Sequence, residues 1–329
     1  MFSHIYIESE AYAYKETRHI LSQFPNAKTI QIGHYKDVFC RRNQQYVQQK
    51  QAPSLILAVK KQNLIYKGAP VCQDFGNKHF YYTSNIMNCV FDCEYCYLQG
   101  MYPSGHIVIF VNIQDIFDEV EKLLKKHPVY LCISYDTDLL AMESITGYGK
   151  TWIDFATKHP DLTIEIRTKC SNYHLLTQIK PIPNVILAWT ISPEPIIAAW
   201  EHKTASMEKR LSAAKKAAED GWRIRLCFDP ILYCHDWKSL YRDMVTKTFC
   251  DLKTDQVFDV SIGVFRVSKD YLKRMRKLRP ASSVLQYPFA IEAGVYDYGE
   301  DLSLEMIHYV KSIVEEYVPE DKIFIWENN

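Results

Sequence analysis

Asn88-Cys89-Val90-Phe91-Asp92-Cys93-Glu94-Tyr95-Cys96-Tyr97 contains three of the chain's ten cysteines within eight residues, in the spacing C-x3-C-x2-C. Cysteine thiolates are soft ligands that suit zinc, Cu(I) or iron–sulfur clusters. A closed zinc site normally takes four ligands from two paired motifs, and no second C-x-x-C occurs in the sequence. Three thiolates on a 4Fe–4S cluster leave one iron without a protein ligand. The stretch therefore predicts a cluster with one open iron; zinc or plain core thiols are the alternatives.

This spacing resembles that of the radical S-adenosylmethionine (SAM) enzymes. The resemblance implies that Cys89, Cys93 and Cys96 bind the 4Fe–4S cluster and that the open iron binds SAM. In that superfamily an electron from the reduced cluster cleaves SAM to methionine and a 5′-deoxyadenosyl radical. The aromatic residue before the third cysteine, here Tyr95, is expected to lie against the adenine of SAM.

Composition limits the protein class. A chain of 329 residues with 47% apolar content suits one large α/β domain with an appendage, or two domains. The N-terminus lacks the pattern of a signal peptide, and no apolar run approaches the roughly 18 residues of a membrane span. Together with ten free cysteines, this predicts a cytoplasmic protein without a membrane partner. The 39 basic and 39 acidic residues balance, so a polyanion site must come from local clustering.

Hydrophobic periodicity divides the chain into three regions. Residues 1–76 read as a small N-terminal α/β subdomain, with strands near 4–7, 29–32 and 54–59 and a helix over about 11–24. Residues 281–329 read as an extension with a hairpin at 286–298, a helix at about 302–317 and a strand at 323–325.

Between these regions, over 77–280, strands alternate with helices such as 113–126 and 206–220. Strand-like runs lie at 80–83, 107–111, 129–134, 162–167, 185–191, 222–228 and 257–264. Such repeats predict a parallel sheet with right-handed crossovers. Without eight clean repeats, the expected fold class is α/β with a partial (β/α)6-type radical SAM barrel. The cysteine loop follows the first of these strands, and parallel barrels carry their sites at the carboxyl ends of the strands.

Beyond the cysteines, the chain resembles the spore photoproduct lyases, DNA repair enzymes that split the thymine dimer 5-thyminyl-5,6-dihydrothymine. The resemblance covers nearly the whole length, and is clearest at Cys93-Glu94-Tyr95-Cys96-Tyr97-Leu98-Gln99, Phe110-Val111-Asn112, Arg167-Thr168-Lys169, Glu201 through Arg210, and Phe228-Asp229-Pro230-Ile231. It implies an oxygen-sensitive carbon–carbon lyase that acts on UV-damaged DNA with a 4Fe–4S cluster and SAM. A reducing electron donor such as flavodoxin or ferredoxin is the expected partner.

The resemblance also implies SAM contacts at the ends of barrel strands. Thr137 and Asp138 occupy one such place, although Asp and Thr are also common in plain turns. Lys169 is similar to a lyase lysine that contacts the SAM carboxylate, and Thr190 and Ser192 end the next strand. Tyr95 and Tyr97 suit hydrogen transfer, because a phenol O–H can donate a hydrogen atom. Tyrosine is abundant, however, with 23 copies.

The chain departs from the family at two places. Tyr135-Asp136-Thr137-Asp138 aligns with a Cys-Thr-Ser-Asp segment whose cysteine donates hydrogen to the thymine radical, so Tyr135 replaces the donor. Cys132 lies three residues back, where strand alternation turns it to the opposite face. An Arg-Tyr pair that the family inserts beside the lesion aligns with Ala290 and Ile291.

These departures leave three hypotheses. The protein is a lyase in which Tyr135 or Tyr97 returns the hydrogen, or it is a radical SAM enzyme with another, possibly nucleic-acid, substrate. The third hypothesis is a non-catalytic iron–sulfur binding or sensing protein. Lys169 and Tyr95 argue against the third, since a protein that only binds a cluster needs no contacts to SAM.

The densest positive charge lies in the segment 269–279, where six cations accompany one acid. On a helix, several of these cations share a face and could neutralise phosphates. A solvated basic helix is the alternative. A lesion in duplex DNA would have to be extruded into the barrel. The predicted nucleic-acid contacts are Lys269, Lys273, Arg274, Arg276 and Lys277.

Overall fold

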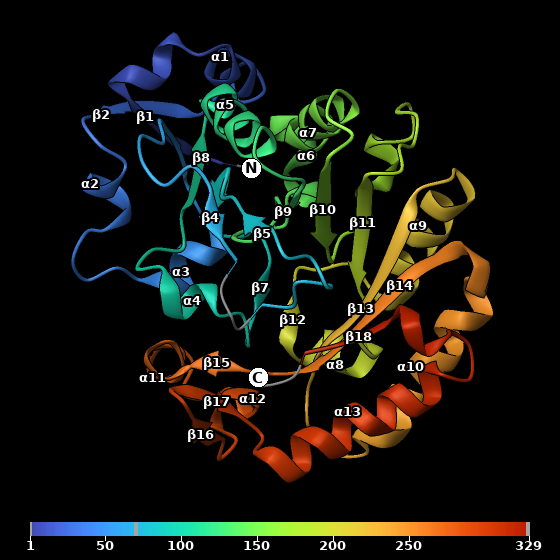
Figure 1. The fold of residues 1–329 in the computed structure, drawn as a ribbon. Helices are drawn as coiled ribbons and strands as arrows, with labels where there is room; N and C mark the ends of the chain where they lie inside the picture. Colours follow the sequence, from blue (N-terminus) through green and yellow to red (C-terminus); the bar gives the residue numbers. More distant parts are fainter. Residues whose placement is uncertain (1, 69–71, 327–329) are drawn as a thin grey trace.

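The computed structural model describes residues 2–68 and 72–326, and a curled eight-stranded sheet dominates it (Figure 1). All neighbouring strands of this sheet are parallel except the pair β4 and β5. In spatial order the strands are β18 (Ile323–Ile325), β14 (Val257–Val264), β13 (Arg223–Ile231), β11 (Val185–Thr190), β10 (Leu162–Thr168), β9 (Val129–Cys132), β5 (Phe80–Tyr82) and β4 (Tyr66–Lys67). This is the expected partial barrel.

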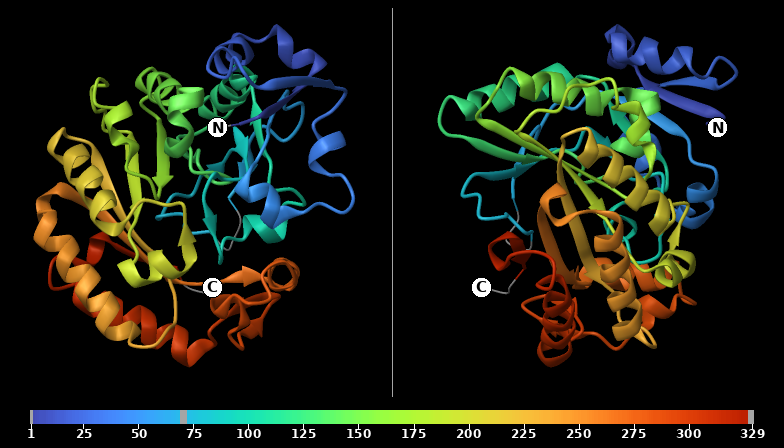
Figure 2. Two further views of the ribbon diagram at one scale, coloured as in Figure 1. Left: turned by 180° about the vertical axis from the view of Figure 1, so that it is seen from behind. Right: turned by 90° about the vertical axis from the view of Figure 1, so that its right-hand side faces the viewer.

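Helices cover the outer side of the curled sheet (Figure 2). Helix α5 (Ile113–Leu124) shows why, since its buried residues Ile113, Ile116, Phe117 and Val120 recur at helical spacing along one stripe. The helices expected at 113–126 and 206–220 are both present, the second as α9. The other long helices of the barrel and its extension are α7 (Tyr148–Thr157), α9 (Met207–Glu219), α10 (Trp237–Asp251) and α13 (Glu300–Val314).

A second sheet of five strands lies beside the barrel. Its order is β2 (Lys28–Ile32), β1 (His4–Glu8), β3 (Leu55–Ala58), β8 (Ile107–Phe110) and β6 (Ile86–Met87). The run at 107–111, expected in the barrel, therefore pairs with β3 in this smaller sheet. All four residues of β8 are buried, and such a continuous apolar run does not indicate which sheet it joins. The division 1–76, 77–280 and 281–329 stays a proposal, and β8 and β6 cross its first boundary.

The C-terminal extension and the helix that precedes it lie near the cysteine loop. The expected hairpin is present as β16 (Ala290–Glu292) and β17 (Val295–Asp297), whose turn holds Ala293 and Gly294 at φ 46° and 81°. Helix α11 (Lys269–Leu278) lies directly on α4 (Leu98–Met101), the helix that follows the last cysteine. A Cβ at Gly100 would lie 2.6 Å from Cβ of Tyr271, so only glycine permits this approach.

The inside of the barrel is polar where the strands face one another. Arg225 on β13 is fully buried and donates to Asp259 at 2.6 Å and to the hydroxyl of Tyr130 at 2.5 Å. It also donates to Glu165, whose pKa is lowered overall: burial raises it, and the charges of Arg167 and Arg225 lower it by more. The strands have an apolar outer face. On their inner face they thus place charged side chains that are paired and hydrogen-bonded to one another.

Within residues 2–68 and 72–326, none of the helices has the length and apolar character needed to cross a bilayer.

Candidate functional site

The cysteine loop is held in place by two side chains that bind its backbone. Lys50 is buried and donates to the carbonyls of both Cys89 and Phe91. Asn88, at φ 73°, donates from its side-chain amide to the carbonyls of Ser104 at 2.7 Å and His106 at 3.0 Å. Asparagine tolerates this left-handed conformation better than most residues. The loop is therefore preorganised by protein contacts alone.

The far side of the loop is tied to distant parts of the chain. Strand β7 (Asp92–Cys93) pairs antiparallel with β12 (Glu201–His202). Arg279, at the end of α11, forms an ion pair with Asp92 and donates to Oε1 of Gln99 at 2.8 Å. These contacts join the loop to β12 and to the end of α11 at once.

The three thiols of the loop lie in surroundings that suit a cluster. Burial raises the pKa of each, that of Cys89 to about 12, while Lys50 and Lys169 lower the pKa of the cysteines they face. Bound metal would have to displace the thiol protons. Among residues 2–68 and 72–326, no three His, Cys, Asp or Glu side chains converge on one metal position, as a mononuclear zinc site requires. A 4Fe–4S cluster places each thiolate on a separate iron.

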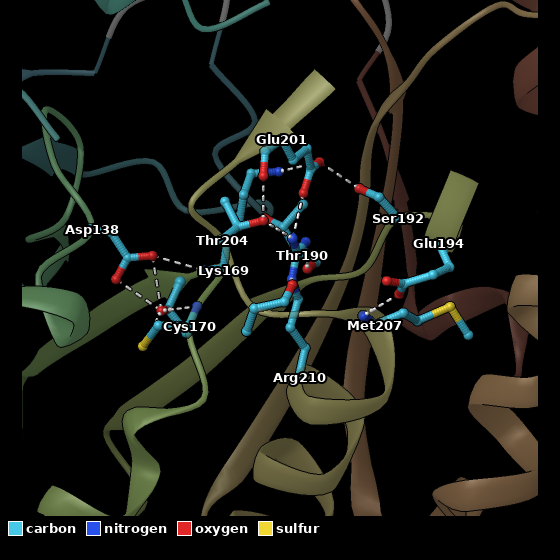
Figure 3. Close-up of polar contacts among 12 residues, drawn as sticks. Asp138, Lys169, Cys170, Thr190, Ser192, Glu194, Glu201, Thr204, Met207 and Arg210 are labelled. Atoms are coloured by element: carbon cyan, nitrogen blue, oxygen red, sulfur yellow. Dashed lines mark hydrogen bonds and ion pairs between the residues drawn. The ribbon is translucent and has the colours of Figure 1, made fainter. Parts of the chain in front are cut away.

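Beside the loop, a buried carboxylate collects four side chains, of which Lys169, Ser192 and Arg210 are labelled in Figure 3. Glu201 on β12 has a fully buried side chain and forms an ion pair with the equally buried Arg210. It accepts from Nζ of Lys169 at 3.0 Å and from Oγ of Ser192 at 2.8 Å, and Tyr95 donates its hydroxyl to the same carboxylate. Four side chains from separate elements are thereby fixed around one charge.

Charge neutralisation keeps Glu201 ionised. Burial raises its pKa, but the positive charges of Lys169 and Arg210 lower it by more, and the pKa falls to about 2. Tyr95 receives a further hydrogen bond from Nζ of Lys169 at 2.9 Å, and that ammonium lies 5.4 Å from the ring centroid. Arg210, the end of the segment that resembles the family, is buried at the centre of this cluster. Lys169, Ser192 and Tyr95 meet at this carboxylate, and their predicted contacts with SAM stay predictions.

The predicted pair Thr137 and Asp138 divides into two roles. The carboxylate of Asp138 accepts from the backbone of Lys169 at 2.7 Å, the backbone of Ala141 at 2.9 Å and the hydroxyl of Thr168 at 2.8 Å, so it organises the turn. The hydroxyl of Thr137 is buried and has no hydrogen-bond partner among the described residues. A buried hydroxyl without a partner is costly, so this hydroxyl is available to a ligand, and the predicted contact of Thr137 with SAM stays a prediction.

Thr190 contributes its backbone. It is buried at the end of β11, where its carbonyl accepts from Nη1 of Arg210 at 3.1 Å. The predicted contact of its side chain with SAM stays a prediction.

A tyrosine set lies on the other side of the loop. Tyr97 donates its hydroxyl to the carbonyl of Tyr135 at 2.8 Å, and their ring centroids are 6.0 Å apart. Tyr135 stacks on Tyr82 at 4.1 Å, and its hydroxyl lies 3.2 Å from Sγ of Cys72. Tyr95, whose hydroxyl is bound in the Glu201 cluster, does not take part in these contacts.

Cys72 is the residue that sequence reasoning missed. It precedes Tyr135 by 63 positions and stands in a segment without motif spacing or periodicity, so no local signal indicated it. Cys132, the thiol nearest to Tyr135 in the sequence, is buried on β9, and burial followed by the charge of Glu165 raises its pKa to about 12. The structure therefore places a different thiol beside Tyr135.

The predicted nucleic-acid residues separate into two groups on α11. Lys269, Lys273 and Lys277 are exposed at successive turns of one face, and Arg274 is half-buried. Arg276 donates to the carbonyls of Leu285 and Tyr287, both at 2.7 Å, so its guanidinium holds the chain that leads to the hairpin. The three lysines are thus the part of the set best placed to meet a phosphate backbone.

The comparisons with known proteins agree with this geometry. A family model described as spore photoproduct lyase matches residues 1–282. The spore photoproduct lyases of Clostridium acetobutylicum and Bacillus subtilis are each 22% identical to this chain, over 91% and 97% of it and 88% and 96% of the relative.

Two solved structures share the fold. A spore photoproduct lyase variant has a TM-score of 0.85 at 18% identity, covering 99% of this chain and 98% of that one. Another variant, with bound AdoMet and dinucleoside spore photoproduct, has a TM-score of 0.83 at 19% identity, covering 100% and 99%. These likenesses confirm the partial (β/α)6-type barrel.

Replacing Glu201 with Gln should lower the free energy of unfolding by about 3–5 kcal/mol, because Arg210 and Lys169 lose their buried counter-charge. The pKa of Glu201 in the folded protein, about 2, lies below its ordinary 4.5. The contribution of ionised Glu201 to the free energy of unfolding is therefore complete above about pH 4.5 and is lost as the pH falls through about 2. Urea unfolding at pH 7 measures the loss.

Glu194→Gln is the matched control, since Glu194 is exposed and accepts only from the backbone of Met207 at 2.7 Å. It should change stability by no more than about 1 kcal/mol. A Glu201→Gln protein as stable as this control would contradict the role assigned to the cluster.

Proposed function

The chain belongs to the spore photoproduct lyase family, and on that premise we propose that it splits 5-thyminyl-5,6-dihydrothymine in UV-damaged DNA into two thymines. The family's enzymes are radical SAM enzymes of DNA repair, with a 4Fe–4S cluster and SAM as cofactors. One observation carries the proposal for this chain: the three-thiol loop, the unpaired hydroxyl of Thr137 and the Glu201 cluster meet at the carboxyl ends of the barrel strands.

The residues present fit these cofactors. Cys89, Cys93 and Cys96 would hold the cluster, since they are three thiols on one preorganised loop, of which Cys93 is buried and the other two are partly exposed. Thr137 would bind SAM, because its buried hydroxyl has no partner among the described residues. When bound, the cluster and SAM supply an electron and a carbon-centred radical that takes hydrogen from the substrate.

The Glu201 cluster positions the SAM side of the site. Lys169, the predicted contact of the SAM carboxylate, is held by Glu201 at 3.0 Å and keeps part of its side chain exposed. The same carboxylate fixes the hydroxyl of Tyr95, so the ring of Tyr95 is held in one position on the SAM side of the site. We assign Tyr95 to cofactor contact, and we assign hydrogen transfer to the tyrosine set on the other side of the loop.

For the return of hydrogen, the geometry favours Cys72 together with Tyr135. The S–H bond of Cys72 breaks and a C–H bond forms on the thymine radical, which leaves the unpaired electron on sulfur. The sulfur then takes the hydrogen of the Tyr135 hydroxyl, 3.2 Å away, which leaves the unpaired electron on the tyrosine ring. Tyr97, hydrogen-bonded to the Tyr135 backbone at 2.8 Å, is the next member of the set.

A second candidate is a radical SAM enzyme of this family with another substrate. The observation that favours it lies on the hairpin, where Ala290 and Ile291 stand at the positions of an Arg-Tyr pair. Ile291 is 48% exposed and therefore presents an apolar tip. A non-catalytic iron–sulfur protein is disfavoured by the Glu201 cluster, which a simple cluster carrier does not need.

The proposed activity is tested on anaerobically reconstituted protein with dithionite, SAM and an oligonucleotide that carries one spore photoproduct. Mass spectrometry follows 5′-deoxyadenosine and repaired thymine, and we expect both. Formation of 5′-deoxyadenosine with the lesion untouched would instead support the second candidate. Neither product from protein with a full cluster would support the non-catalytic alternative.

In the same assay, Cys72→Ala and Tyr135→Phe should each lower lesion repair at least about tenfold, the scale at which loss of one positioned proton or hydrogen donor is felt. Formation of 5′-deoxyadenosine should continue, since both residues act after hydrogen abstraction. The matched control is Cys250→Ala, which removes an exposed thiol. Repair by Cys72→Ala at the rate of this control would exclude Cys72 as donor.

Reversing two charges on α11, Lys273→Glu with Lys277→Glu, should weaken binding of DNA of any sequence, because these exposed lysines contribute to counterion release. The slope of log K against log salt should decrease by about 2 in magnitude. Lys209→Glu with Lys216→Glu on α9 controls for net charge. Equal slopes for the two double variants would show that α11 does not meet the DNA.

A further inference from the structure

A separate hollow lies next to the tyrosine set, between the smaller sheet and the edge of the barrel. Its volume is about 450 Å³, within the range of about 300–1,000 Å³ that is usual for ligand pockets. Aromatic rings form much of its wall, from Tyr35, Tyr66, Tyr82, Tyr102 and Phe110. The mechanism proposed above uses none of these side chains except through the Tyr82–Tyr135 stack.

The polar part of the wall is formed by a cation and a carboxylate joined by one serine. Nζ of Lys60, which is buried, donates to the carbonyl of Ser84 at 3.1 Å, and the hydroxyl of Ser84 donates to Oδ2 of Asp136. Burial lowers the pKa of Lys60 to about 8 although Asp136 attracts its charge, and burial raises the pKa of Asp136. The hydrogen bonds of Ser84 and Tyr102 and the charge of Lys60 lower the pKa of Asp136, but by less than burial raises it.

Two hydrogen-bonding positions remain for a ligand at this wall. Oδ1 of Asp136 is buried and has no partner among the described residues, so it needs a donor. The ammonium of Lys60 has three N–H groups, and the carbonyl of Ser84 takes one of them. An occupant with an N–H and a C=O side by side on a flat ring satisfies both residues and fills the aromatic wall.

We propose that this hollow binds an unpaired thymine-type base of the strand that carries the lesion, in the nucleotide next to it; this rests on the proposed function. The imide edge of thymine offers N3–H to Asp136 and a carbonyl oxygen to Lys60. Aromatic side chains are the usual platforms for unpaired bases. The exposed lysines Lys36 and Lys61 lie at the rim, where the sugar–phosphate backbone would pass.

Other occupants fit less well. A phosphate at the wall would meet the carboxylate of Asp136, and like charges there repel. A purely apolar ligand would leave Oδ1 of Asp136 without a partner and would offer the buried ammonium of Lys60 no acceptor beyond the carbonyl of Ser84, which costs more than the contact contributes. A base has both the ring and the paired donor and acceptor.

The aromatic stack connects this hollow with the reaction site. The rings of Tyr66 and Tyr82 are parallel at 4.9 Å, and Tyr82 stacks in turn on Tyr135 at 4.1 Å. A base held at Lys60 and Asp136 would therefore lie one ring away from the residue that faces Cys72. Binding of the neighbouring nucleotide would place the lesion against the hydrogen-donating pair.

The test measures the Kd of labelled single-stranded oligonucleotides that carry one spore photoproduct, flanked by thymine or by an abasic site. The wild-type protein should bind the thymine-flanked strand about 10- to 100-fold more tightly, as expected for hydrogen bonds to charged groups. In Lys60→Met and in Asp136→Asn this ratio should fall close to one. Lys67→Met, an exposed position on β4 outside the hollow, is the matched control and should keep the ratio.

Equal affinities of the wild-type protein for the two strands would overturn the proposal, and this result needs no variant to fold. A ratio that survives in Lys60→Met would overturn it as well. Because the readout is binding, it is independent of catalysis. If binding depends on the flanking base but no lesion is repaired, the proposed lyase activity is contradicted, while the proposal that the hollow binds a base is supported.

Discussion

The neutralisation of one buried carboxylate holds the site together. Glu201 has no access to solvent, so its charge is stable only while Arg210 and Lys169 stay beside it. Its strand β12 pairs with β7, which contains Cys93, and the same carboxylate fixes Tyr95. One charge balance thereby positions the cluster loop, the lysine expected to face SAM and the aromatic wall.

The contacts around the cysteine loop form two groups, one on each side of it. On one side of the cysteine loop, phenol and ammonium groups are bound to Glu201 and act as fixed walls. On the other side, the Tyr135 hydroxyl lies 3.2 Å from the Cys72 thiol, and the Tyr97 hydroxyl donates to the backbone carbonyl of Tyr135. A phenol whose hydrogen is bonded to a buried carboxylate is a poor hydrogen donor, so the proposed function assigns Tyr95 and Tyr97 different roles although they are two positions apart.

The replacement of the family's donor cysteine by Tyr135 is compensated in space. A thiol from the segment ahead of the barrel, Cys72, lies 3.2 Å from the Tyr135 hydroxyl. The same neighbourhood contains the Tyr66–Tyr82–Tyr135 stack and the hollow with Lys60 and Asp136. The position at which the family's donor cysteine is replaced thus lies beside groups that, under the proposals above, bind a base and return a hydrogen atom.

The sequence by itself determined the three cluster thiols, the alternating strands and helices and the C-terminal hairpin, because ligand spacing and hydrophobic periodicity are local properties. Only the tertiary structure decided what depends on contacts across the chain. It placed β8 in the smaller sheet, Cys72 at Tyr135 and Arg210 against Glu201, and it bound Arg276 to backbone carbonyls. The sequence around a charged residue or a thiol does not identify the distant group that it will contact, so these partners are known only from the folded structure.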